Sequence, residues 1–219
     1  MIDFIQSEAQ FFIFCLTTLF TLINPIGIAP LLLVMTERFS KQEKINIAWK
    51  GSFTAFFTLI LFAILGSFIF NVFGITIEAF QIMGGILFFR NGLRMLEVKV
   101  GRSRTTPAEQ EESQESDDIA ISPIGIPLIA GPGAITAAML LSSQTPQYYS
   151  YVTLGLSIFL VLSLVYLILR NGDVLMNVLG TTGMRIIQRL MGLILLVIAV
   201  QFVINGAVSV IRPLISPSF

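Results

Sequence analysis

The sequence predicts an all-α membrane protein of six transmembrane helices, arranged as two inverted three-helix repeats with broken first and fourth helices. Three observations lead to this prediction. Of the 219 residues, 55% are hydrophobic and 12% are charged, where soluble domains carry about 25% charged residues. The apolar residues gather into six stretches, each close to the roughly 20 residues that cross a bilayer. Proline–glycine motifs interrupt the first and fourth stretches.

Short polar segments separate the six predicted spans and hold most of the charges. We place the spans at 9–35, 47–70, 75–96, 119–141, 152–169 and 186–211. The first span is expected to be a retained helix and not a cleaved signal peptide, because its leader holds Asp3 and Glu8 and no basic residue.

The distribution of basic residues predicts the topology. Twelve of the thirteen Lys and Arg residues lie in the segments 36–50, 90–104 and 170–189, which alternate with segments that hold only Arg212. The positive-inside rule places the basic segments in the cytoplasm. We therefore expect a multi-pass protein of the cell inner membrane with both termini outside, in the periplasm. Three tyrosines would then lie in an outer aromatic belt: Tyr148, Tyr149 and Tyr151.

A polar segment at 97–118 divides the chain. We predict a first three-helix repeat at 1–96, an acidic cytoplasmic linker at 97–118 and a second, inverted three-helix repeat at 119–219. The stretch 105–118 holds six carboxylates and no basic residue, which is typical of a solvated connector. A regulatory docking tail is the alternative.

The two halves share short sequence matches. A shift of 107 places Pro25 on Pro132, and a shift of 108 places 82–87 on 190–195. Because each half has three spans, the second half must enter the membrane from the opposite side. Inverted repeats recur in secondary transporters, with the binding site at their interface.

The interrupted spans are the best candidates for that site. Residues 24–30 read NPIGIAP and residues 130–134 read AGPGA, and proline removes a backbone N–H and disfavours a continuous helix. Breaks inside a membrane are tolerated where the backbone is buried in protein or lines a wet cavity. Structural kinks without a ligand are the alternative interpretation.

The chemistry available there is neutral, since no Asp, Glu, Lys or Arg lies in the centre of a span. Free N–H groups and carbonyls at the half-helix ends suit the two charges of a small zwitterion. We expect Asn24 and Thr136 to contribute side-chain contacts, although Asn24 could simply cap the following half-helix. Other neutral candidates are Thr17, Thr18, Thr21, Gln81 and Ser122.

Small residues spaced seven apart in the third and sixth spans predict that these helices pack closely together. They are Gly85, Gly92, Gly192, Ala199 and Gly206. A stripe that lines the transport path is the alternative. Asn91 and Asn205, beside glycines, are expected to form hydrogen bonds across helices.

Several function classes are excluded by composition. The chain has no histidine and one cysteine, which argues against an enzyme, a metal site and a nucleophilic His pair. The formal charge is zero, so no nucleic-acid footprint is present. We expect no cofactor, the lipid bilayer and a small zwitterionic substrate as partners, and possible oligomers.

The two motifs and the six spans resemble the MarC family of bacterial and archaeal inner-membrane proteins, which is also classed as small neutral amino-acid transporters. The resemblance implies transport of substrates such as glycine and alanine, and carries a historical association with multiple antibiotic resistance. The substrate-binding residues that it implies are Asn24, Pro25, Gly27, Pro30, Gly131, Pro132 and Gly133.

The function that we predict is therefore secondary transport of small neutral amino acids by alternating access. A non-transporting membrane scaffold or assembly protein, and an exporter or channel for another small solute, are the alternatives. The coupling ion, sodium or a proton, is left open, because the sequence offers no buried carboxylate or histidine chain for a proton relay.

Overall fold

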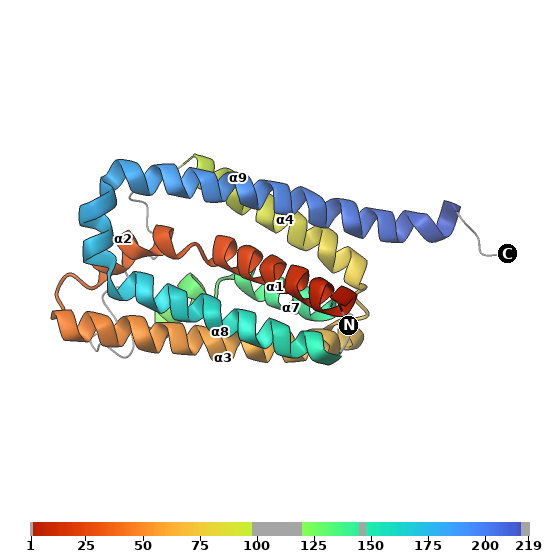
Figure 1. The fold of residues 1–219 in the computed structure, drawn as a ribbon, viewed down its shortest axis with the longest axis horizontal. Helices are drawn as coiled ribbons and strands as arrows, with labels where there is room; N and C mark the ends of the chain where they lie inside the picture. Colours follow the sequence, from red (N-terminus) through yellow and green to blue (C-terminus); the bar gives the residue numbers. More distant parts are fainter. Residues whose placement is uncertain (1, 98–119, 145–147, 216–219) are drawn as a thin grey trace.

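The structure, a computed structural model, describes residues 2–97, 120–144 and 148–215, and every regular element within these ranges is a helix (Figure 1). The predicted linker at 97–118 therefore lies almost wholly outside the described residues. The helices are α1 (Ile2–Ile23), α2 (Pro25–Met35), α3 (Lys41–Phe73), α4 (Ile77–Leu96), η1 (Ala120–Ile129), α7 (Pro132–Ser143), α8 (Tyr148–Arg170) and α9 (Gly172–Ile215).

Four stretches of helix are long and apolar enough to cross a membrane, at 7–35, 41–66, 150–170 and 182–211. The pair η1 and α7, bent by 59° at its break, would make a fifth span. The helix α4 carries Glu78, Arg90 and Arg94 and is not among them. The structure thus confirms an all-helical chain with several apolar membrane helices, and the sixth span remains a prediction.

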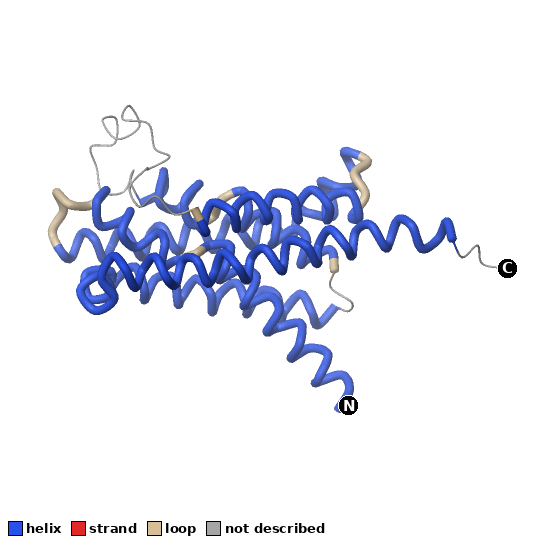
Figure 2. The backbone as a smooth tube through the Cα atoms, turned by 90° about the horizontal axis from the view of Figure 1, so that it is seen from above, coloured by secondary structure: helices blue, strands red, loops and turns tan. Residues whose placement is uncertain are grey.

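Successive spans run in opposite directions along one bundle, so that the beginning of α1 and the end of α9 lie at the same end (Figure 1). The opposite end holds the turn between α2 and α3 and the turn between α8 and α9. Seen from above, the beginning of α1 and the end of α9 diverge from each other (Figure 2).

Local sequence signals explain where α3 and α4 begin and end. Ser40 and Glu43 form a reciprocal capping box at the start of α3, which satisfies two of the N–H groups that a helix start leaves free. Gly74 ends α3 at φ 63°, a conformation that glycine adopts without steric cost. Thr76 then caps α4 by accepting from the N–H of Ala79 at 3.2 Å.

The helices α4 and α9 pack against each other along the predicted stripe of small residues (Figure 1). A Cβ placed on Gly85 would lie 2.8 Å from the carbonyl oxygen of Ala199, and one on Gly92 would lie 3.0 Å from that of Gly192. Gly206 meets the backbone of Glu78 in the same way, at 2.9 Å. The pairing runs antiparallel, and the prediction of a close-packed seam is confirmed.

The broken spans pack in matching ways in the two halves. The helix α1 lies against α8 and η1 lies against α3, while α2 contacts α9 and α7 contacts α4. Each first segment also contacts the second segment of the other half: α1 contacts α7, and η1 contacts α2. The two broken spans therefore lie together inside the bundle.

Three details differ from the sequence expectations. Asn205 does not bond across helices, because its Oδ1 accepts from Gln201 Nε2, one turn earlier on α9, at 2.7 Å. Pro30 lies inside α2 and does not interrupt it. The segment before the last predicted span is also helical: α9 starts at Gly172 and is interrupted at Gly180, where φ is 60°. Its stretch of membrane length, 182–211, agrees with the predicted span at 186–211.

Candidate functional site

The break in the first span is centred on Asn24, which separates α1 from α2. Its backbone is left-handed, with φ 51° and ψ 61°, a region that asparagine tolerates better than most residues. Its side-chain Oδ1 accepts from the N–H of Gly27 at 3.2 Å, and buried Pro25 occupies the first helical position. Asn24 therefore caps α2, as the alternative interpretation of this residue expected.

The break in the fourth span has a different chemistry. Gly131 takes the capping position before α7, and no side chain caps this helix. Pro132 has no N–H, so the first backbone donors of α7 are those of Gly133 and Ala134, and both residues are buried. A helix start with free N–H groups carries partial positive charge and favours an anion.

The two breaks meet at one point. A Cβ placed on Gly133 would lie 3.4 Å from a methyl carbon of Leu22, two residues before Asn24. Thr136, one turn into α7, is 7% exposed and rests its methyl carbon on Gly84 of α4. The structure thus places the end of α1, which leads into Asn24, against Gly133, and it places Thr136 against α4.

Other predicted residues lie at the edge of this cluster. Gly27 is partly buried and Pro30 lies farther along α2. A Cβ placed on Gly131 would lie 2.9 Å from the carbonyl oxygen of Pro127. The close approach of the backbone there therefore requires glycine. Pro132 is exposed.

The two neighbouring threonines of the first span, Thr17 and Thr18, lie in different surroundings. Thr18 is fully buried, and its hydroxyl has no hydrogen-bond partner among the described residues. It lies one turn before Leu22 and therefore on the same face of α1. Thr17 points elsewhere and donates to the carbonyl of Ile13 at 2.7 Å.

Two carboxamides at the breaks were missed as site residues. Asn91 Nδ2 would lie 3.1 Å from a Cβ on Gly133, and Gln188 Nε2 would lie 3.1 Å from a Cβ on Gly27. The signal in the sequence that could have indicated them is a polar amide within an apolar span. Asn91 was interpreted as a packing residue, and Gln188, between Arg185 and Arg189, has the neighbours of a helix end.

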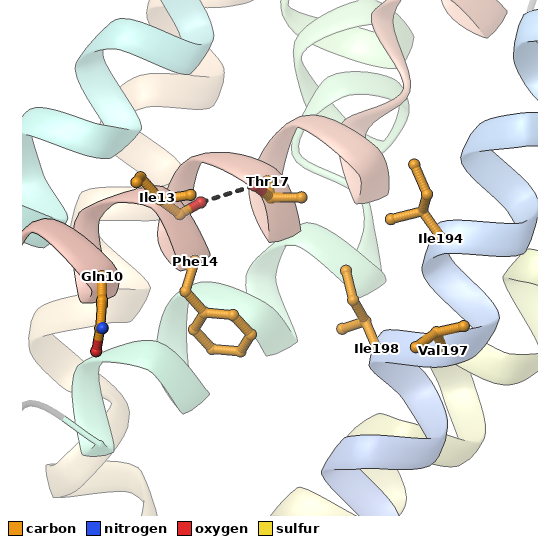
Figure 3. Close-up of a pocket in the computed structure, with 7 residues that line it drawn as sticks. All are labelled: Gln10, Ile13, Phe14, Thr17, Ile194, Val197 and Ile198. Atoms are coloured by element: carbon orange, nitrogen blue, oxygen red, sulfur yellow. Dashed lines mark hydrogen bonds between the residues drawn. The ribbon is translucent and has the colours of Figure 1, made fainter.

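A cavity of about 490 Å³ lies between α1 and α9, outside the cluster at the breaks (Figure 3). Ile13, Phe14 and Thr17 of α1 face Ile194 and Ile198 of α9 across it. Its walls are almost entirely apolar, so a charged solute would gain little there. Among the described residues, no group of three His, Cys, Asp or Glu side chains could hold a metal ion.

Comparison with known proteins decides the family. Residues 9–211 match the family described as MarC family integral membrane protein. The chain belongs to the MarC family. This membership agrees with the resemblance drawn from the two motifs and shows that the apolar helices belong to an integral membrane protein.

Relatives of this MarC protein span bacteria and archaea. A UPF0056 membrane protein of Methanocaldococcus jannaschii is 37% identical and covers 91% of this chain and 97% of its own length. The UPF0056 membrane protein YvbG of Bacillus subtilis is 36% identical, over 90% and 94% of the two chains. One from Aquifex aeolicus is 32% identical, over 97% and 99%. No solved structure matches the chain.

Proposed function

We propose that this MarC protein is a secondary transporter of small neutral amino acids, of the glycine and alanine type, across the inner membrane. The observation that carries the proposal is the meeting of the two helix breaks at Leu22 and Gly133. Broken helices at matching points of two halves are a recurring way in which transporters build a substrate site.

The two breaks offer complementary charges. The uncapped start of α7, at Gly133 and Ala134, suits a carboxylate. The start of α2 is capped by Asn24, but Pro25 cannot donate to the carbonyl of Thr21, four residues earlier. Carbonyls at the end of α1 can therefore accept from an ammonium group, and the pair of breaks suits a zwitterion.

The surroundings favour a small substrate. Leu22 and Asn91 both lie close to Gly133, and Thr136 rests on Gly84. A side chain larger than a methyl group would displace these neighbours. Glycine and alanine therefore fit better than branched or aromatic amino acids.

The packing of the two halves supports alternating access. The second segment of each broken span contacts the last helix of the other half: α2 contacts α9, and α7 contacts α4. The two broken spans also contact each other, α1 with α7 and η1 with α2. In an inverted repeat, exchanging the conformations of two such halves converts an outward-open site into an inward-open one.

Uptake of radiolabelled glycine and alanine into proteoliposomes tests the proposal, with sodium and proton gradients imposed separately and leucine and phenylalanine as larger competitors. We expect saturable uptake that is accelerated when the vesicles are preloaded with unlabelled substrate. Saturable uptake without acceleration by preloading would favour a channel. No uptake of any amino acid above that of empty vesicles would contradict transport and favour a scaffold role.

A further inference from the structure

The helices α4 and α9 each place one carboxamide at a break in the opposite half of the chain. Asn91 of α4 lies at Gly133, where α7 begins, and Gln188 of α9 lies at Gly27, in the first turn of α2. Both side chains are partly buried. Gly92 directly follows Asn91, and Gly192 lies one turn after Gln188, so the close contact between these two glycines positions both amides.

Asn91 and Gln188 differ from the two carboxamides Gln201 and Asn205, which pair with each other on α9. Gln201 Nε2 donates to Asn205 Oδ1 at 2.7 Å, and both side chains are exposed. Among the described residues, Asn91 and Gln188 have no such partner. A partly buried amide without a partner in a membrane protein is unfavourable unless water or a ligand completes its hydrogen bonds.

A further polar group without a partner lies nearby. The hydroxyl of Thr18 is completely buried and has no hydrogen-bond partner in the described part of the chain. It shares a face of α1 with Leu22, which contacts the Gly133 position. The region between the breaks therefore holds more hydrogen-bonding capacity than its own residues satisfy.

We infer that Asn91 and Gln188 are substrate-contacting residues that recognise the two ends of a small zwitterion, an inference that rests on the proposed transport function. Asn91 presents its NH₂ group beside the uncapped N–H groups of α7 and binds the substrate carboxylate. Gln188 lies where Asn24 already accepts from the N–H of Gly27, so this helix start offers an anion fewer free backbone donors than the start of α7 does. The Nε2 of Gln188 lies at Gly27, which leaves the carbonyl oxygen of Gln188 to accept from the substrate ammonium.

The test uses near-isosteric variants of the full chain in detergent, Asn91→Leu and Gln188→Met. The matched controls are Asn205→Leu and Gln201→Met, which make the same changes at exposed positions on α9. Glycine affinity is measured by calorimetry, and folding by size exclusion and by thermal unfolding without ligand. Loss of a hydrogen bond to a charged group predicts about tenfold weaker binding for each site variant, with both controls within about twofold of the parent protein.

Analogues with a single charge distinguish recognition from a structural effect. Propionate carries only the carboxylate, and glycinamide carries only the ammonium group. We expect Asn91→Leu to weaken competition by propionate more than competition by glycinamide, and Gln188→Met to do the reverse.

Three results would overturn the inference. Glycine affinity within twofold of the parent in both site variants would show that the amides do not contact substrate. Equal loss of both analogues in each variant would show a structural effect. If the parent protein neither binds nor transports small neutral amino acids, the proposed function is overturned together with this inference. If the parent transports them and both site variants behave as the parent does, this inference alone is overturned.

Discussion

Gly133, at the start of α7, and Leu22, at the end of α1, are in contact although 111 positions separate them in the sequence. A Cβ on Gly133 would lie 3.4 Å from the Leu22 methyl carbon and 3.1 Å from the Asn91 amide nitrogen. The absence of a side chain at Gly133 therefore lets the two helix breaks approach each other.

Replacement of Gly133 by leucine should abolish transport. The new side chain would occupy the space between Leu22 and Asn91, where the substrate is proposed to bind. We expect the initial rate of glycine uptake into proteoliposomes to fall at least about tenfold, equivalent to about 1.4 kcal/mol.

The matched control is Gly155→Leu on α8. A Cβ placed on Gly155 has no atom within 4 Å, so this variant should transport at the parent rate. Normal glycine flux in Gly133→Leu, with equal amounts of protein in the vesicles, would reject the site at the breaks.

Enlarging a glycine of the seam between α4 and α9 should destabilise the protein. A Cβ on Gly85 would already lie 2.6 Å from a methyl carbon of Val203 and 2.8 Å from the carbonyl oxygen of Ala199. Overpacking of this kind costs about 1–3 kcal/mol. We expect Gly85→Val to unfold at a lower temperature in detergent than the parent, and Gly155→Val to match the parent. Equal unfolding temperatures for the two variants would show that the seam is not tightly packed.

The left-handed backbone at Asn24 predicts an unusual order of substitutions. Asn24→Gly keeps the conformation freely and loses only the cap, at a cost of a few tenths of a kcal/mol. Asn24→Val loses the cap and adopts φ 51° with a branched side chain, which costs about 2–3 kcal/mol. Titration with a denaturing detergent measures the difference. If the valine variant proved as stable as the glycine variant, Asn24 would not hold the chain in this conformation.

The topology can be tested with single cysteines. The native Cys15 is 0% exposed, so the parent protein should react little with a membrane-impermeant maleimide. Lys41, at the start of α3, and Ile75, in the turn after α3, lie near opposite ends of the same helix and are both exposed.

We expect the maleimide to label Ile75→Cys in intact spheroplasts and Lys41→Cys only after the membrane is permeabilised, because the positive-inside rule places the basic segment inside. The reverse pattern of labelling would show that the termini face the cytoplasm.

Much of the fold could be predicted because its signals are local. Apolar run length indicated the membrane helices, and the prolines at 25 and 132 indicated breaks that the structure shows next to both of them. The small residues spaced seven apart correctly indicated the contact of α4 with α9. Asn205 was predicted incorrectly, because an amide bonds as readily to a neighbour on its own helix as to another helix.

The composition of the site was harder to predict. Asn24 and Thr136 were expected to act alike, yet Asn24 caps α2 whereas Thr136 is buried against Gly84. No local pattern marked Gln188, because its proposed role rests on its short distance from Gly27, a residue in the other half of the chain.

The sequence by itself determined that this is a helical membrane protein, which spans are broken and at which residues, since hydrophobic length and the backbone chemistry of proline and glycine act within a few residues. Only the tertiary structure decided that the two breaks touch and that one helix start is capped while the other is open. It also decided that Asn91 lies at the break before α7 and Gln188 at the break before α2. These properties arise from the packing of helices that are distant in the sequence, because steric contacts between atoms far apart in the chain depend on the whole fold.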